Sequence, residues 1–253
     1  MKATTDSRLT YAKELQHIVV VGDNHGKWGE LGYRIRERYK IRDSVICIAG
    51  DIGMGFEKTG FYLDEFKKLN RILENTNNVL FMVRGNHDDP SYFQGDKAPL
   101  VDMFSRIKLV PDYFLLETGP ANILFVGGAT SIDRTQRVEG SSYWSNEQCV
   151  YDPIAIANLT DKVTVVVTHT APKFADPTTK TGIMGWFNED WRLIDECEKE
   201  RHNMTMIYDH LKKNDHEIKY WCYGHFHFSK RVQHDTTTFI VCDEQEFYEL
   251  RFE

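Results

Sequence analysis

The stretch LFMVRGNHDDP, from Leu80 to Pro90, joins an apolar run to a group of polar side chains. The run VLFMV, Val79 to Val83, is short and almost continuously apolar, which is typical of a strand buried on both faces. A glycine lets the chain turn sharply after such a strand. The turn at Gly85 therefore predicts a polar site at the end of a buried strand, built from Asn86, His87, Asp88 and Asp89.

Other apolar runs extend this pattern along the chain. Helical patterns separate the first three strands: a stripe from Phe61 to Leu73 and a weaker one from Trp28 to Ile35. This alternation predicts parallel connections, whereas the second half is richer in strands. The short connection Asp243–Gln245 predicts a hairpin between the last two strands. Besides 79–83, the predicted strands are 17–21, 45–49, 123–127, 163–168, 219–223, 238–242 and 246–251.

The chain shows no repeat, low-complexity tract or linker, so we expect one domain over residues 1–253. One segment, about 173–215, interrupts the strands with glycines and tryptophans and then a charged helical pattern. We interpret it as an insertion or lid over one end of the sheet.

Composition excludes several classes of protein. The net charge is -7 and no long basic run occurs, which disfavours binding to long nucleic acid. Five cysteines without a CxxC pair argue against a disulfide framework or a thiolate zinc site. The N-terminus lacks an apolar signal-like core, and no apolar run reaches about 18 residues. We therefore expect a cytoplasmic protein that does not enter a membrane; the oligomeric state stays open.

Five of the predicted strands end in metal-binding residue types. In an α/β sheet, ligands bind beyond the carboxyl ends of the strands, so these groups should converge. Carboxylate, imidazole and carboxamide oxygen suit divalent ions of intermediate hardness. Seven groups exceed what one catalytic ion needs but fit two ions about 3.5–4 Å apart. The seven are Asp23, His25, Asp51, Asn86, His169, His225 and His227.

Each block alone has a simpler interpretation. Asp and His are frequent in turns after strands, and a His-x-His pair can simply be exposed on a surface strand. The five blocks together favour a metal site, because a purely structural role does not require this ligand chemistry.

The blocks GDNHG, GDIG, GNHD, HTAP and GHFH, in this order between Gly22 and His227, resemble the calcineurin-like metallophosphoesterase superfamily, in a form typical of bacteria and bacteriophages. The resemblance implies an α/β (α+β) fold, a four-layer β-sandwich flanked by helices, with two metals at the strand ends. It assigns Asp23, His25 and His227 to the first metal and Asn86, His169 and His225 to the second, with Asp51 as the bridge. His87 would act on the leaving group, and Asp88 would orient or charge-stabilise His87.

The resemblance also implies a reaction, in which hydroxide generated at the metals attacks phosphorus. The second block, GDIGMGF, lacks the Asp-Arg pair of the superfamily's protein phosphatases, which makes phosphoproteins less attractive substrates. We expect a phosphodiesterase for a nucleotide or a nucleic-acid end. A phosphomonoesterase for nucleotides or phosphopeptides and a non-catalytic metal-binding scaffold are the alternatives. Mn²⁺ is the favoured cofactor, with Fe, Zn, Ni, Co or Mg as other candidates.

Arg134, in SIDRTQR, is the predicted substrate-binding residue. It follows the 123–127 strand, and a guanidinium binds phosphate through two parallel hydrogen bonds. A surface salt bridge is the equally weighted alternative. Trp186 and its aromatic neighbours would stack on a base if the substrate is a nucleotide, although packing is the more common role of such residues.

Overall fold

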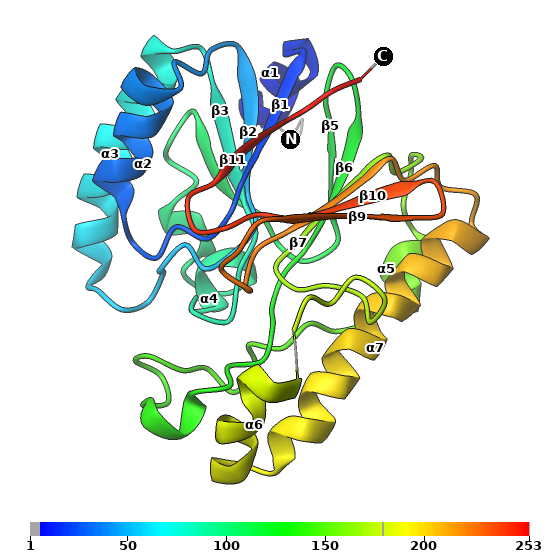
Figure 1. The fold of residues 1–253 in the computed structure, drawn as a ribbon. Coiled ribbons are helices and arrows are strands. Elements are labelled where there is room, and N and C mark those ends of the chain that lie inside the picture. The colour runs from blue at the N-terminus through cyan, green and yellow to red at the C-terminus, as the bar shows by residue number, and fades with distance from the viewer. Residues whose placement is uncertain (1–5, 179, 253) are drawn as a thin grey trace.

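Two β-sheets pack face to face in the computed structural model, which describes residues 6–178 and 180–252 (Figure 1). The first sheet has the order β11-β1-β2-β3-β4 and the second β5-β6-β7-β8-β10-β9. The first comprises β1 (His17–Val21), β2 (Ser44–Ile48), β3 (Val79–Met82), β4 (Ile107–Leu109) and β11 (Phe247–Leu250). The second comprises β5 (Phe114–Glu117), β6 (Asn122–Val126), β7 (Val165–Thr168), β8 (Tyr220–Tyr223), β9 (Lys230–His234) and β10 (Thr237–Val241).

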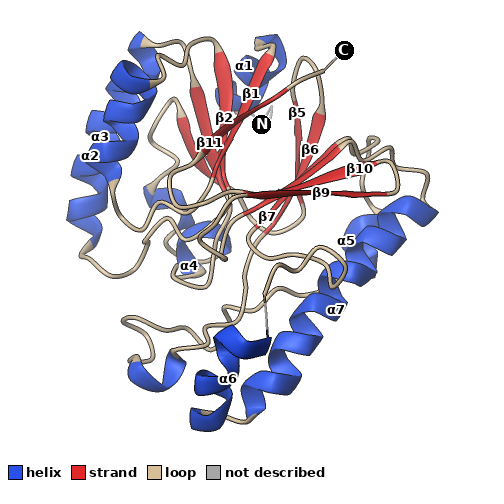
Figure 2. Ribbon diagram, in the orientation of Figure 1, coloured by secondary structure: helices blue, strands red, loops and turns tan. Residues whose placement is uncertain are grey.

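Helices cover the outer faces of both sheets (Figure 2). The long ones are α3 (Thr59–Asn75) on the first sheet and α7 (Arg192–Lys213) on the second. The shorter α-helices are α1 (Ser7–Glu14), α2 (Trp28–Tyr33), α4 (Ser91–Gln94), α5 (Pro153–Ala157) and α6 (Lys180–Glu189). A π-helical turn, η1 (Arg34–Arg38), and two 3₁₀ turns, η2 (Ala98–Leu100) and η3 (Arg134–Gln136), complete the elements.

Alternation along the strands divides the core into layers. On the fully buried β2, Val45 and Cys47 belong to the cluster between the two sheets, whereas Ile46 and Ile48 pack toward α2 and α3. Successive side chains of a strand point to opposite faces, so a strand covered on both sides must be apolar throughout. The resulting order of helix, sheet, sheet and helix confirms the predicted four-layer α/β sandwich.

The helical stripe predicted from Phe61 to Leu73 is confirmed as α3. Its inward face is formed by Tyr62, Phe66, Leu69 and Leu73, which are buried. Phe61 instead points outward and is 43% exposed, because it lies one position away from this face.

The predicted hairpin over Asp243–Gln245 is wrong. β10 pairs with β8 and β9, whereas β11 crosses to the first sheet and pairs antiparallel with β1. The hairpin partner of β10 is β9, connected by Asp235 and Thr236. The sequence KRVQH of β9 is mostly polar because β9 is an exposed edge strand, and polar residues suit an edge that must not pair further.

The segment 173–215 contains α6 and α7. The buried face of α7, including Met204, Ile207 and Leu211, packs on the second sheet as part of the core. Figure 1 shows α6 set apart from the sheets, below the strand ends. Among the described residues, no helix combines the length and the apolar character needed to cross a bilayer.

Candidate metal centre

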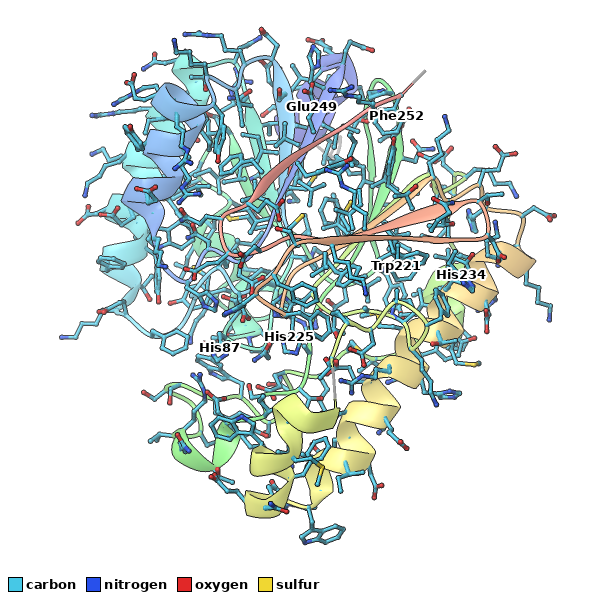
Figure 3. All side chains as sticks on the ribbon, in the orientation of Figure 1. His87, Trp221, His225, His234, Glu249 and Phe252 are labelled. Carbon is cyan, nitrogen blue, oxygen red and sulfur yellow. The ribbon has the colours of Figure 1, made fainter. Side chains whose placement is uncertain are left out.

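The polar side chains predicted from the sequence converge at one end of both sheets. His87 and His225 lie at this end, facing the side on which α6 is found (Figure 3). Three blocks follow β1, β2 and β3 of the first sheet, and two follow β7 and β8 of the second. All five strands are parallel to a neighbour, so their carboxyl ends meet at a common edge.

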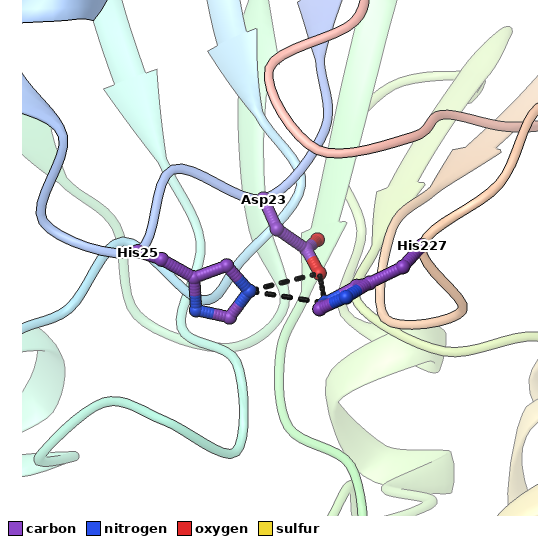
Figure 4. Close-up of side chains that lie close together, drawn as sticks. All are labelled: Asp23, His25 and His227. Carbon is purple, nitrogen blue, oxygen red and sulfur yellow. Dashed lines mark hydrogen bonds and ion pairs between the residues drawn. The ribbon is translucent and has the colours of Figure 1, made fainter.

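Asp23, His25 and His227 form a first group (Figure 4). His227 Nε2 lies 3.0 Å from Asp23 Oδ2 and 3.0 Å from His25 Nε2, and His25 Nε2 lies 3.7 Å from Asp23 Oδ2. A cation about 2.1 Å from each of three ligand atoms holds them about 3 Å apart. Two imidazole nitrogens that face each other at this distance need a proton or a cation between them, so the group fits a metal ion.

Asp51, Asn86 and His169 form a second group around the next strand ends. His169 Nε2 lies 3.2 Å from Asp51 Oδ1 and 3.0 Å from Asn86 Oδ1. The other ring nitrogen of His169, Nδ1, lies 2.7 Å from the carbonyl oxygen of Ala49. A carbonyl can only accept, so Nδ1 carries a proton and Nε2 is the nitrogen that a cation would bind.

Asp23 connects the two groups. The carboxylates of Asp23 and Asp51 both lie close enough to His169 to form a three-residue group with it, so Asp23 of the first group borders the second. Asp51 as the bridging ligand therefore stays a prediction. His225 lies beside His169, with the ring centroids 5.0 Å apart, and its backbone N–H donates to both carboxylate oxygens of Asp23.

Glycines make room for this convergence. A Cβ at Gly85 would overlap the carboxylate and the backbone nitrogen of Asp51, and a Cβ at Gly224 would overlap the carboxylate of Asp23. Close approach of the backbone to a neighbouring loop thus explains the glycine of each of these two blocks.

Burial and neighbouring charges perturb the titration of the group. Burial alone would raise the pKa of Asp51, but the imidazoles of His169 and His87 hold it well below its usual range. Burial would lower the pKa of His169, but the carboxylates of Asp51 and Asp23 raise it to about 10. Burial lowers the pKa of His225 well below its usual range. Strongly shifted groups of both signs in one cavity are typical of a functional site.

His87 lies at the edge of the two groups rather than within them. Its backbone N–H donates to Asp51 Oδ1 at 2.7 Å, and its Nε2 lies 3.8 Å from Asp51 Oδ2. Burial lowers the pKa of the His87 imidazole, with the Asp51 carboxylate acting in the opposite direction. This position, in reach of the centre but beside it, is compatible with the predicted role at the leaving group.

Among the described residues, no hydrogen bond joins the Asp88 carboxylate to the His87 side chain, so Asp88 does not orient His87 directly. The alternative role, stabilising the charge of His87, stays a prediction. The Asp88 carboxylate is fully buried and accepts four backbone N–H groups, those of Ile52, Gly53, Met54 and Gly85, at 2.8–3.1 Å. Burial and the nearby Asp51 raise its pKa to about 7, against the effect of these donors. Asp88 therefore holds the loop after β2 against the loop after β3.

Arg134 faces away from the centre, which corrects its assignment as the phosphate-binding residue. Its guanidinium pairs with Asp190 at 2.8 Å and with both carboxylate oxygens of Glu196, and the side chain is only 9% exposed. The guanidinium is thus engaged by α7 and by the turn before it. The structure therefore contains the alternative role of Arg134, a salt bridge, although the pair is largely buried and not on the surface.

The arginine that faces the centre is Arg137, three residues later in the same segment. Its Nη2 lies 3.4 Å from His87 Nε2, and Asp133 holds the guanidinium through two hydrogen bonds of 2.6 and 2.7 Å. The sequence contained this signal, since SIDRTQR has both arginines. Only the η3 turn, which begins at Arg134 and ends just before Arg137, sends the two side chains in different directions.

Two buried glutamates near the centre were not predicted from the sequence. Glu147 accepts hydrogen bonds from the backbone N–H and the hydroxyl of Ser131, and Glu200 on α7 accepts from Thr170, next to His169, and from the backbone of Thr130. Burial raises the pKa of Glu147 to about 8, against the effect of the Ser131 donors, and bound cations nearby would act in the same direction as those donors. Single acidic residues outside a motif carry no sequence signal of this kind.

Comparisons with known proteins identify a family and solved structures of similar fold. The family model for calcineurin-like phosphoesterases matches residues 16–229. No curated protein matches the sequence. Among solved structures, the protein TT1561 of Thermus thermophilus is similar with a TM-score of 0.51 at 14% identity, over 91% of this chain and 90% of that one.

Two further structures resemble the chain more loosely. The phosphopantetheinyl hydrolase of Mycobacterium tuberculosis has a TM-score of 0.49 at 15% identity, over 91% of this chain and 90% of that one. A putative 5′-nucleotidase from Staphylococcus aureus has a TM-score of 0.49 at 14% identity, over 94% of this chain but 51% of that one. The family model covers most of the chain, so this protein belongs to the calcineurin-like phosphoesterase family and is a phosphoester hydrolase.

Proposed function

We propose that the protein is a two-metal phosphodiesterase that cleaves a small diester, such as a nucleotide or a nucleic-acid end. The supporting observation is that the centre opens onto two cavities, which share His87, Asp133 and His227. A diester carries an organic group on each side of phosphorus, whereas a monoester carries only one. Two cavities meeting at one phosphate position therefore favour a diester.

The first cavity, of about 490 Å³, lies between the centre and α6 and includes Trp186, Phe226 and Phe228 in its wall. The second, of about 630 Å³, has Trp28, Phe56 and Phe61 in its wall, the last two partly exposed. Both volumes are in the range that accommodates a small organic ligand. Aromatic walls suit planar groups such as nucleobases, because stacking on an aromatic ring tolerates any base.

Arg137 and His87 are the groups we assign to the reacting phosphate. When bound, two divalent cations supply positive charge to the phosphoryl oxygens and lower the pKa of a bound water toward 7. The Arg137 guanidinium, oriented by its hydrogen bonds to Asp133, can donate to a non-bridging phosphoryl oxygen at the mouth of the second cavity. His87 Nε2 accepts from Arg137 in the free site, and we assign the protonated ring as the donor to the departing oxygen beside it.

We assign Mn²⁺ as the favoured cation because the ligands combine carboxylate, imidazole and carboxamide oxygen.

A small ester is the proposed substrate, and we propose a cytoplasmic location for the protein. The net charge of -7 disfavours long nucleic acid. A steep fall of DNA affinity with rising salt would contradict this last point, since it reports many phosphate contacts.

Hydrolysis of bis-p-nitrophenyl phosphate and of p-nitrophenyl phosphate tests the proposal. Metal-stripped protein would be assayed with added Mn²⁺, and Asp51→Asn would serve as the inactive control. We expect faster Mn²⁺-dependent cleavage of the diester. Faster cleavage of the monoester would refute the diester preference and favour a phosphatase for nucleotides or phosphopeptides.

A further inference from the structure

A buried chain of hydrogen bonds runs from the second group away from the centre. Asn86 Nδ2 donates to Ser131 Oγ at 3.0 Å, and Ser131 Oγ donates to Glu147 Oε2 at 2.7 Å. The backbone N–H of Ser131 donates to Glu147 Oε1 at 2.6 Å. All three residues are at most 2% exposed, so water does not compete for these bonds.

The direction of these hydrogen bonds decides which end of the Asn86 carboxamide faces the metal group. The oxygen and the NH₂ group are nearly identical in size, but only the oxygen has lone pairs for a cation. Asn86 Oδ1 lies 3.0 Å from His169 Nε2, on the side of the metal group, while its amide nitrogen faces Ser131. A half-turn of the amide would present N–H groups to the cation and would abolish binding through this residue.

With cations bound nearby, Glu147 is held as a carboxylate that can only accept. The single hydrogen of the Ser131 hydroxyl is then donated to Glu147, and the Ser131 oxygen is left to accept from Asn86. The acceptor itself is fixed in place. The buried guanidinium of Arg84 donates to the carbonyl oxygen of Glu147 at 2.6 Å and also pairs with Asp112. The bond to the main-chain oxygen fixes the backbone of Glu147, and the two bonds from Ser131 hold its carboxylate.

We propose that Ser131 and Glu147 are positioning residues, which orient the Asn86 carboxamide so that its oxygen faces the second metal ion. The inference rests on the proposed two-metal centre and extends it to residues that touch no metal themselves. Residues that orient a ligand in this way typically contribute a factor of about 10–100 to metal affinity.

Titration of the metal-stripped full chain with Mn²⁺, followed by the electron paramagnetic resonance signal of free Mn²⁺, tests the inference without any substrate. The wild type should bind two ions. Ser131→Ala should weaken one of the two sites by about 10–100-fold and leave the other unchanged. Ser131→Thr keeps the hydroxyl and should restore the affinity. Glu147→Gln should weaken Mn²⁺ binding as much as Ser131→Ala does. Its amide turns an N–H toward one of the two Ser131 donors, the hydroxyl or the backbone N–H.

A matched background separates orientation from a general structural role. In an Asn86→Asp background either oxygen can face the metal, so removing the Ser131 hydroxyl should change Mn²⁺ affinity less than about 3-fold. A loss equal to that in the Asn86 background would overturn the inference, as would wild-type affinity of Ser131→Ala for both ions. A wild type that binds fewer than two ions would overturn the proposed centre, and with it the inference.

Discussion

Asp88→Asn tests whether Asp88 holds two loops together or acts through His87. The substitution keeps the size of the side chain but replaces one carboxylate oxygen by an NH₂ group. Oδ1 accepts from Gly53 and Met54, and Oδ2 accepts from Ile52 and Gly85. Either orientation of the new amide therefore leaves two buried backbone donors without an acceptor.

Each unpaired buried donor costs about 1–3 kcal/mol, so Asp88→Asn should lower the free energy of unfolding by about 2–6 kcal/mol. Domains are stable by about 5–15 kcal/mol in total, so this is a large share. Urea unfolding in EDTA would measure the loss without a contribution from metal binding. Asp96→Asn, at an exposed site eight residues away, is the matched control and should change stability by about 0.5 kcal/mol or less.

The two roles of Asp88 give different patterns. A residue that acts only through His87 would lower kcat and leave stability unchanged. A residue that holds the loops after β2 and β3 would lower stability and also weaken Mn²⁺ binding, because Asp51 and Asn86 lie in those loops. Suppose that Asp88→Asn lowers the free energy of unfolding by less than about 1 kcal/mol, with an unchanged slope against urea concentration. The claim that its unpaired backbone donors destabilise the fold would then be refuted.

Other substitutions separate residues of the centre from their neighbours. Arg134→Ala should lower stability, through the lost pairs with Asp190 and Glu196, and leave KM for the diester unchanged. Arg137→Ala should lower kcat/KM about 10–100-fold, the value of a hydrogen bond to a charged group; equal kinetics for the two variants would contradict this distinction. His87→Ala should lower kcat about 10²–10⁴-fold with two Mn²⁺ retained, and loss of an ion, detected by metal analysis, would make His87 a ligand. Saturating Mn²⁺, at about 100 times its Kd, should raise the free energy of unfolding by about 2.7 kcal/mol per bound ion over EDTA, and thermal melts independent of metal would exclude a site specific to the folded state.

The convergence of the site could be predicted from the sequence because each ligand block follows an apolar strand. Strand ends meet at one edge whatever the details of the loops, so the order of strands in the chain was sufficient. The sequence could not decide which sheet each strand joins. β10 and β11 have similar patterns, yet they belong to different sheets, because Asp243 to Glu246 crosses between the sheets instead of turning back.

The directions of individual side chains could not be predicted from the sequence. Arg134 and Arg137 have the same chemistry and lie three residues apart, and only the one-turn η3 helix sends one to α7 and the other to the centre. Ser131 and Glu147 are 16 residues apart and belong to no block, so their contact depends on tertiary packing alone.

The backbone of the site gives a further reason to assign it a function. His25, Asp51, His225 and His227 have φ between 44° and 69°, the left-handed region. Such a conformation costs a residue with a side chain about 1–3 kcal/mol relative to one that adopts it freely, and glycine would satisfy the fold alone at lower cost. The carbonyl of Asp51 accepts the backbone N–H groups of Asn24 and His25, at 3.0 and 2.7 Å, which fixes two of the strained turns to each other. These contacts fix the backbone of two turns that carry predicted ligands. The strain carried by four predicted ligand residues is consistent with selection for binding rather than for stability.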